Sequence, residues 1–104
     1  MFSVLVQGPA MAPTLRDGDE VLVRRGGRAI RPGDVVVAEF ASRPGRIVVR
    51  RAARQVPGGW WLTSDNPFGG DTSETLGPAT VIGRVLFRWW PRPGQLPGPP
   101  VFLS

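Results

Sequence analysis

The sequence predicts an all-β domain, built as a strongly bent sheet or a partly open barrel. Short apolar runs rich in β-branched residues recur at a spacing of roughly ten residues, which is typical of sandwiches and barrels. The 104 residues include 14 glycines and 12 prolines, so turn signals separate these runs. No long window keeps the apolar period of an amphipathic helix, and we expect only single-turn helices.

The first half of the chain contains three of the expected strands. The run at 2–6 ends at Gly8-Pro9, and Pro13 excludes a helix interior from the segment that follows. The turn signal at 16–19 introduces a strand at 20–24. A loop at 25–33, with a glycine pair and a Pro-Gly, leads to 34–40, a run rich in β-branched residues.

The second half is expected to add three strands and a tail. A turn at 42–45 introduces the strand 46–52, and Pro57-Gly58-Gly59 introduces the strand 60–63. A long polar loop, 64–78, leads to the last strand, 79–90, which should bend at Gly83. We therefore expect one domain at 1–90 and an irregular Pro/Gly-rich tail at 91–104.

The composition excludes most familiar catalytic chemistry. The chain has no lysine, histidine, cysteine or tyrosine, and all 13 basic residues are arginine. Ser-His, Cys-His and Ser-Lys catalysis and His/Cys metal sites are therefore excluded within this chain, and we expect no metal and no cofactor. The net charge of +5 favours acidic partners, but the arginines are scattered, so nucleic acid is not the favoured partner. The absence of cysteine fits a reducing compartment, and the short apolar N-terminus predicts neither a signal peptide nor a membrane span. We expect a cytoplasmic protein.

Four separated segments, taken together and in order, resemble the type I signal peptidase family of serine–lysine proteases. They are Gly8-Pro9-Ala10-Met11-Ala12-Pro13-Thr14-Leu15 with Gly18-Asp19, then Pro32-Gly33-Asp34-Val35-Val36, then Ile47-Val48-Val49-Arg50-Arg51-Ala52, and finally Ser64-Asp65-Asn66-Pro67 with Gly77 and Gly83-Arg84. Among its members the chain looks most like the short soluble peptidases that mature nickel-type superoxide dismutase. The same sheet is similar to the self-cleaving domain of LexA-like repressors. The resemblance implies an all-β fold and an extended peptide as partner, such as a superoxide dismutase precursor.

The departures from this family fall on its chemistry. The position of the nucleophilic serine is Ala10, and that of the lysine general base is Arg50, which cannot accept a proton. In the family's Ser-x-Asp-Ser-Arg stretch, the first serine falls on Gly70, the aspartate on Thr72 and the arginine on Glu74, so only Ser73 is kept. The resemblance assigns the peptide-binding and oxyanion region to Gly8, Pro9, Met11 and Pro13. It assigns structural motif positions to Asp19, Asp34, Arg51, Asp65, Asn66, Ser73 and Arg84.

Several of these residues also have a plain structural interpretation. Asp19, Asp34 and Asp65 adjoin glycine or asparagine and are expected to accept turn hydrogen bonds. Arg50 and Arg51 are adjacent in a strand, so one side chain should point inward and the other outward. An inward Arg50 needs a carboxylate or carbonyl partner. The four tryptophans, 60, 61, 89 and 90, are expected to pack in the core or at its rim.

Three functions are compatible with the sequence. The favoured one is an inactive signal-peptidase homologue, a pseudo-peptidase that binds an extended peptide by strand addition. The second is an active endopeptidase of unusual mechanism, with Ser64, Thr72 or Ser73 as nucleophile and Asp65 or Asp71 as base; an ordinary Asp, with a pKa near 3.9, is a poor base for this purpose. The third is a basic nucleic-acid-binding module. For the favoured function, Ala10 and Arg50 must lie side by side.

Overall fold

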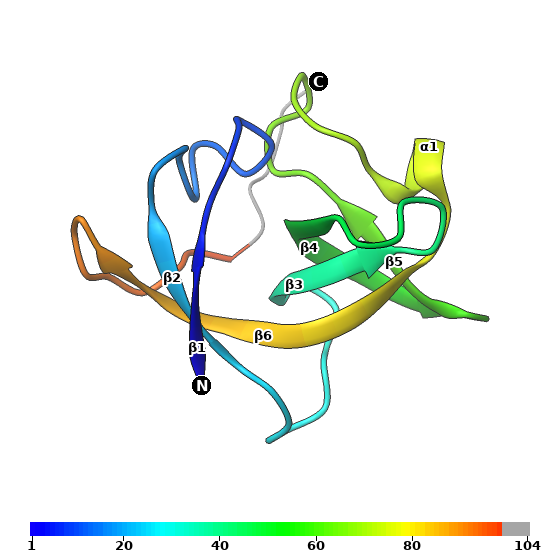
Figure 1. Cartoon of the computed structure of the whole chain (residues 1–104), viewed down its shortest axis with the longest axis horizontal. Coiled ribbons are helices and arrows are strands. Elements are labelled where there is room, and N and C mark those ends of the chain that lie inside the picture. Colours follow the sequence, from blue (N-terminus) through cyan, green and yellow to red (C-terminus); the bar gives the residue numbers. More distant parts are fainter. Residues whose placement is uncertain (99–104) are drawn as a thin grey trace.

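The computed structural model describes residues 1–98 and consists of one bent antiparallel sheet with a single helical turn. Figure 1 shows how the sheet curls around itself, with β1 and β2 at one end and β3, β4 and β5 at the other. The elements are β1 (Phe2–Leu5), β2 (Glu20–Arg24), β3 (Val35–Phe40), β4 (Ile47–Val56), β5 (Gly59–Thr63), α1 (Ser73–Leu76) and β6 (Ala79–Trp90). The strand order is β1-β2-β6-β3-β4-β5, with a further β5–β6 pairing at Trp60 and Ala79. The predicted all-β class and bent, partly closed sheet are confirmed.

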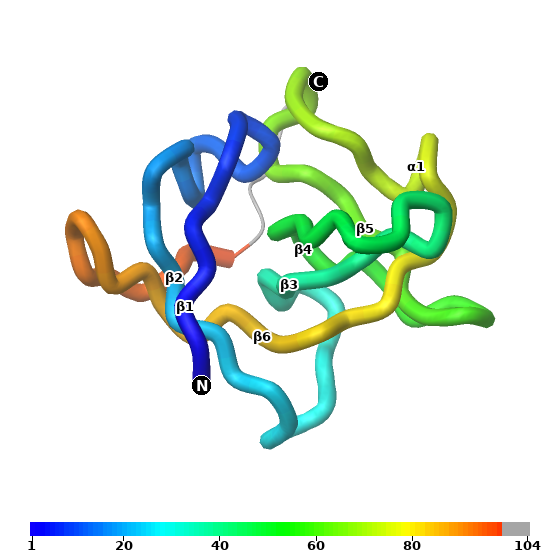
Figure 2. Tube along the Cα trace, viewed as in Figure 1, coloured from blue at the N-terminus to red at the C-terminus, as the bar shows by residue number. Residues whose placement is uncertain are grey.

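The long strand β6 joins the two ends of the sheet, and its curved path is plain in Figure 2. Its first half pairs with β3 and its second half with β2. The ladder with β3 shifts register between Val37 and Ala38, which produces a bulge beside Gly83. A Cβ added at Gly83 would lie 2.7 Å from Val23 Cγ1 and 2.9 Å from the carbonyl oxygen of Arg24. Glycine is therefore required here because β2 and β6 approach closely.

The core consists of two apolar clusters that share β3 as their common wall. Val35 and Val37 belong to the cluster that also contains Met11, Leu15 and the β2 valines. Val36, Ala38 and Phe40 belong to the second cluster, inside the ring formed by β3, β4, β5 and β6. Successive strand residues point to opposite faces, so a strand buried on both faces needs an unbroken apolar run. This explains why the apolar run at 35–38 is unbroken.

Most predicted elements are present, with shifts at their ends. β4 continues to Val56, four residues beyond the predicted end, because its second half pairs with β5. The polar loop contains α1, whose N-cap is Thr72. In the described part of the tail, Gly94 exchanges two backbone hydrogen bonds with Arg88, and Leu96 packs against the first core cluster. The remaining tail residues, 99–104, lie outside the described residues, and the domain boundary at 90 stays a prediction. No helix among residues 1–98 is long and apolar enough to cross a membrane.

Candidate functional site

The segment that carries Ala10 leaves β1 and folds back over the first core cluster. Met11 and Leu15 are buried in that cluster, and their spacing closes a turn in which Leu15 N donates to Met11 O at 2.8 Å. Gly8 begins the turn with φ +82, a conformation that favours glycine. Ala10 itself is only 4% exposed. The apolar anchors therefore fix the position where the resemblance places a nucleophile.

Arg50 reaches this position from β4. Its Nε donates to Asp71 O at 2.8 Å, and its Nη1 donates to Val49 O at 2.8 Å. Burial lowers the pKa of Arg50 from its ordinary value; the charge of Asp71 opposes this shift and that of Arg46 adds to it. A guanidinium nevertheless stays protonated at physiological pH. Arg50 is therefore a buried cation that uses main-chain carbonyl groups as partners and can donate but not accept a proton.

Gly70 lies between Ala10 and Arg50 and shows that the two are neighbours. A Cβ added at Gly70 would overlap the Cβ of Ala10 and would lie 2.9 Å from Nη2 of Arg50. The expected juxtaposition of Ala10 and Arg50 is thus present, although 40 positions separate them in the sequence. Sequence reasoning treated Gly70 only as a lost serine, whereas the structure makes it a contact residue. Its φ is +78, a backbone conformation that favours glycine, but a glycine in a polar loop does not reveal such a contact from sequence.

Arg51, the next residue, meets a different environment on the opposite face of β4. Its Nη2 lies 2.5 Å from Oδ2 of Asp65, and its Nε donates to Oδ1 at 3.1 Å, so the carboxylate is held by two bonds. Thr14 Oγ1 donates to Oδ2 of Asp65 at 2.5 Å, and Arg51 Nη1 donates to Gly33 O at 2.9 Å. The expectation that one of the two arginines points outward is wrong, because both are buried. The expectation for Asp65 as a turn acceptor is also wrong, because its partners are 14 and 51 positions away.

The other motif residues are structural in their contacts. Asn66 fastens its loop to the Ala10 segment through its N–H to Ala10 O at 2.9 Å and its Nδ2 to Pro9 O at 3.1 Å. Ser73 Oγ is buried and accepts from Leu62 N at 2.7 Å. Asp19 accepts from Arg16 N at 2.9 Å, which is the predicted turn role.

Asp34 also fills its predicted turn role, accepting from Arg31 N at 2.8 Å, and it forms an ion pair with Arg28 at 2.8 Å. Burial acts to raise the pKa of Asp34, but the bonds from Arg28 and Arg31 N and the charges of Arg28 and Arg84 outweigh it and lower that pKa. Within residues 1–98, Arg84 Nε is the one buried side-chain nitrogen or oxygen without a hydrogen-bond partner.

The tryptophans divide between packing and exposure. Trp60 packs against the second core cluster, and Trp61 lies under the guanidinium of Arg54 at 4.9 Å. Trp89 and Trp90 are exposed, and Trp89 Nε1 donates to Ser3 Oγ at 2.9 Å.

The hydroxyl groups considered as alternative nucleophiles are engaged elsewhere. Ser64 Oγ donates to Asn66 O at 2.8 Å, and Thr72 Oγ1 accepts from Glu74 N as the cap of α1. Ser73 is sealed in the core. Both oxygens of Asp65 are bonded to Arg51 and Thr14. None of these three hydroxyl groups contacts a carboxylate among the described residues, so the geometry offers them no base.

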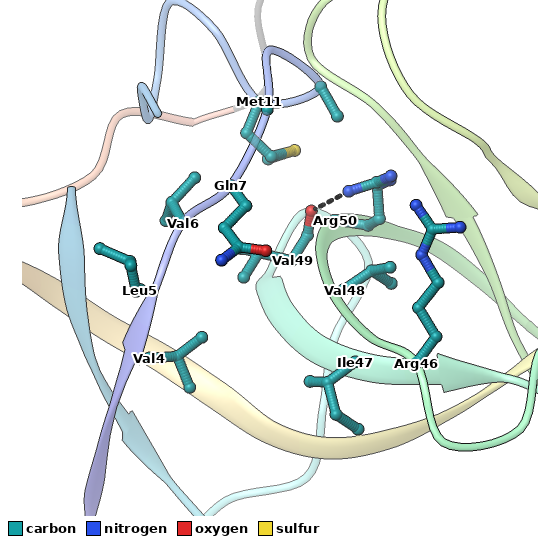
Figure 3. Close-up of a pocket in the computed structure, with 12 residues that line it drawn as sticks. Val4, Leu5, Val6, Gln7, Met11, Arg46, Ile47, Val48, Val49 and Arg50 are labelled. Atoms are coloured by element: carbon teal, nitrogen blue, oxygen red, sulfur yellow. Dashed lines mark hydrogen bonds between the residues drawn. The ribbon is translucent and has the colours of Figure 1, made fainter. Parts of the chain in front are cut away.

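A groove of 110 Å³ runs between β1 and β4 and ends at Ala10 and Arg50; we call it the β1–β4 groove. Figure 3 shows Val4–Gln7 on one side and Arg46–Arg50 on the other, with Met11 near the end where Arg50 lies. Leu5 and Ile47 are exposed apolar side chains of the groove, and its lining includes two arginines and no acidic residue. Its residues are Val4, Leu5, Val6, Gln7, Gly8, Ala10, Met11, Arg46, Ile47, Val48, Val49 and Arg50. Of the predicted peptide-binding residues, Gly8 and Met11 line it and Pro9 and Pro13 do not.

The two strands that border the groove have free backbone edges within the described part of the chain. β1 pairs only with β2, and the β4–β5 ladder begins at Arg51, so residues 47–49 pair with β3 alone. Val6 bonds toward the β2 side, through Asp19 O and Gly18 N. Bonding directions alternate along a strand, so Leu5 and Gln7 direct their backbone groups into the groove. On β4, Ala52 N donates to Asp34 O, so the backbone of Ala52 bonds toward β3. By the same alternation, the backbone groups of Ile47 and Val49 point away from β3, into the groove.

Comparison with models of protein families identifies the family of this chain. Residues 1–86 match the model of the family described as peptidase S24-like. The match spans every element up to the middle of β6 and includes both Ala10 and Arg50. No curated protein matches the chain.

Proposed function

The chain belongs to the peptidase S24-like family, and we propose that it is a catalytically inactive member that keeps a groove for an extended peptide. One observation carries this proposal: the position of the nucleophile is a buried alanine, and beside it the position of the base is a guanidinium bonded to two carbonyl groups. Peptide hydrolysis by a side-chain nucleophile needs an acceptor for its proton. Arg50 cannot serve as that acceptor.

The loop around Gly70 also argues against simple loss of one hydroxyl. Asn66 fastens this loop to the Ala10 segment, and Gly70 packs directly on Ala10. A serine at position 10 would need room for its hydroxyl in the space that Gly70 and Arg50 border. The residues at positions 10, 50 and 70 therefore pack against one another, so their replacements are structurally coupled rather than independent.

The free strand edges support peptide binding. An extended peptide lying in the β1–β4 groove can pair with Leu5 and Gln7 on one side and with Ile47 and Val49 on the other. The volume of 110 Å³ is far below the range of roughly 300–1,000 Å³ typical of small-molecule pockets. A main chain with small side chains suits this space better than a bulky ligand. A superoxide dismutase precursor is the specific partner that the sequence resemblance suggests.

The test of this proposal measures peptide cleavage. The substrate is a peptide with small residues before the scissile bond, incubated with wild type, Ala10→Ser, Arg50→Lys and the double variant. We expect no turnover by wild type or by either single variant. The double variant rebuilds the nucleophile–base pair and is expected to be weak at best, because Gly70, Thr72 and Glu74 do not restore the supporting bonds. Cleavage of the peptide by wild type that persists after repurification would contradict the proposal.

A further inference from the structure

Arg50 lies at one end of the β1–β4 groove and is a cation whose hydrogen-bonding capacity is only partly used. Arg50 uses Nε and Nη1 on two main-chain carbonyl groups, and no atom of the described residues accepts from its Nη2. Within residues 1–98, the one fully buried side-chain nitrogen or oxygen without a hydrogen-bond partner is Arg84 Nε. The unpartnered Nη2 of Arg50 is therefore not fully buried. Arg50 lines the groove, so its guanidinium there keeps a donor that no described atom uses.

Strand pairing along β4 stops at the same place. Val49 O, which faces the groove, already accepts from Nη1 of Arg50 at 2.8 Å. Beyond Val49, Gly70 packs against Ala10 and lies close to Nη2 of Arg50. A peptide that pairs with Ile47 and with the N–H of Val49 therefore meets the guanidinium of Arg50 next.

The charge of the groove favours an anion at this end. Arg46 directly precedes β4 and lines the same groove, and Figure 3 shows its guanidinium on the Arg50 side. No aspartate or glutamate lines the groove to neutralise them. Guanidinium groups match carboxylates in geometry and charge, and a carbonyl-bonded arginine keeps donors for a further partner.

We propose that the β1–β4 groove binds the free carboxyl terminus of a peptide, with the terminal carboxylate on Arg50. This rests on the proposed function, because it names the kind of peptide that the groove takes. Figure 3 shows Val4–Gln7 and Ile47–Arg50 running toward the same end. A peptide whose C-terminus lies at that end is parallel to both strands, a pairing that sheets allow. On this proposal the site recognises the C-terminus of a peptide and does not cleave the chain.

The test compares two peptide pools that differ only at the terminus. One pool of N-terminally labelled hexapeptides made from Ala, Val, Leu and Thr carries a free carboxylate; the second is its C-terminal amide. Binding to the intact wild-type chain is followed by fluorescence anisotropy. We expect the free acids to bind about 10-fold or more tightly, the size of one charge-assisted hydrogen bond. Because this comparison uses wild type, it does not depend on any variant folding.

Variants then locate the carboxylate. Arg50→Gln should remove the preference for the acid, whereas Arg43→Gln should keep it. Arg43 lies in an exposed turn outside the groove, so this control makes the same change of charge. Equal binding of acids and amides to wild type overturns the carboxylate assignment and leaves the peptide groove standing. Binding of neither pool overturns the groove as well, and a preference that survives in Arg50→Gln places the carboxylate elsewhere and overturns the assignment to Arg50.

Discussion

Arg50 and Arg51 are consecutive residues of β4, both buried, yet their two surroundings are built differently. Arg51 meets a carboxylate, Asp65, through two bonds, and the network also includes Thr14 and the carbonyl groups of Gly33, Pro97 and Gly98. Arg50 meets only carbonyl groups and borders a groove. A buried charge costs stability unless a partner compensates it. The fully compensated arginine therefore belongs to the scaffold, and the partly compensated one belongs to the candidate site.

The largest expected effect comes from exchanging each arginine for methionine. Arg51→Met leaves Asp65 as a buried charge without its partner, which should lower the free energy of unfolding by about 3–5 kcal/mol. Arg50→Met leaves no carboxylate behind, so we expect a change within about 1 kcal/mol, of either sign. Urea unfolding of the two variants beside wild type measures both values. Equal losses would show that the two arginines contribute alike and would remove the distinction.

Thr14 offers a finer probe of the Asp65 side. Thr14→Val keeps the shape of the side chain and removes the hydroxyl that donates to Asp65. A hydrogen bond to a charged group contributes about 1.5–3 kcal/mol, so a loss of that order is expected in urea unfolding. Thr80→Val is the matched control, because Thr80 is exposed on β6 and should change stability by less than about 0.5 kcal/mol. If both variants behave alike, Asp65 does not depend on Thr14.

The smallest effect is expected at the exposed ion pair of Arg28 and Asp34. The pKa of Asp34 is lowered in the folded chain, so its contribution to stability is present above the ordinary pKa near 3.9. That contribution is lost as the pH falls through the lower folded value. The stability difference between wild type and Asp34→Asn should therefore shrink below about pH 4. Thermal unfolding between pH 7 and 3 measures it, with Glu74→Gln as an exposed control. A difference that stays constant over this range contradicts the assignment.

The fold was largely predictable because its signals are local. Runs of β-branched residues between Pro/Gly turns marked all six strands, and the glycine at 83 marked the bend. The late end of β4 was missed because Arg54 and Gln55 interrupt the apolar run, and the strand conformation there depends on pairing with β5, a tertiary contact.

The candidate site was predictable only in part, because its contacts join distant segments. Motif order indicated that position 10 meets position 50. It could not indicate that Asp65 pairs with Arg51 rather than with a turn amide, since a turn residue and a buried ion-pair partner look alike in sequence. Nor could it place Gly70, because a glycine in a polar loop is usually only a turn. The unpaired edges of β1 and β4 follow from which strands pair with which. The sequence of a single strand does not reveal its pairing.

Gly70 also has a consequence for the mutational history of the chain. Any side chain at position 70 would overlap the Cβ of Ala10 and press on Arg50, and its backbone conformation itself disfavours a Cβ. The effect of Gly70→Ser, which introduces the serine that the family resemblance places at position 70, therefore depends on which residues occupy positions 10 and 50. Gly70→Ser made first brings a steric clash with Ala10 and Arg50. Ala10→Ser made first adds a hydroxyl but leaves it without a general base, because Arg50 cannot accept its proton. On the proposed function, no single change at 10, 50 or 70 rebuilds a nucleophile–base pair, so peptidase activity would need changes at 10 and 50 together.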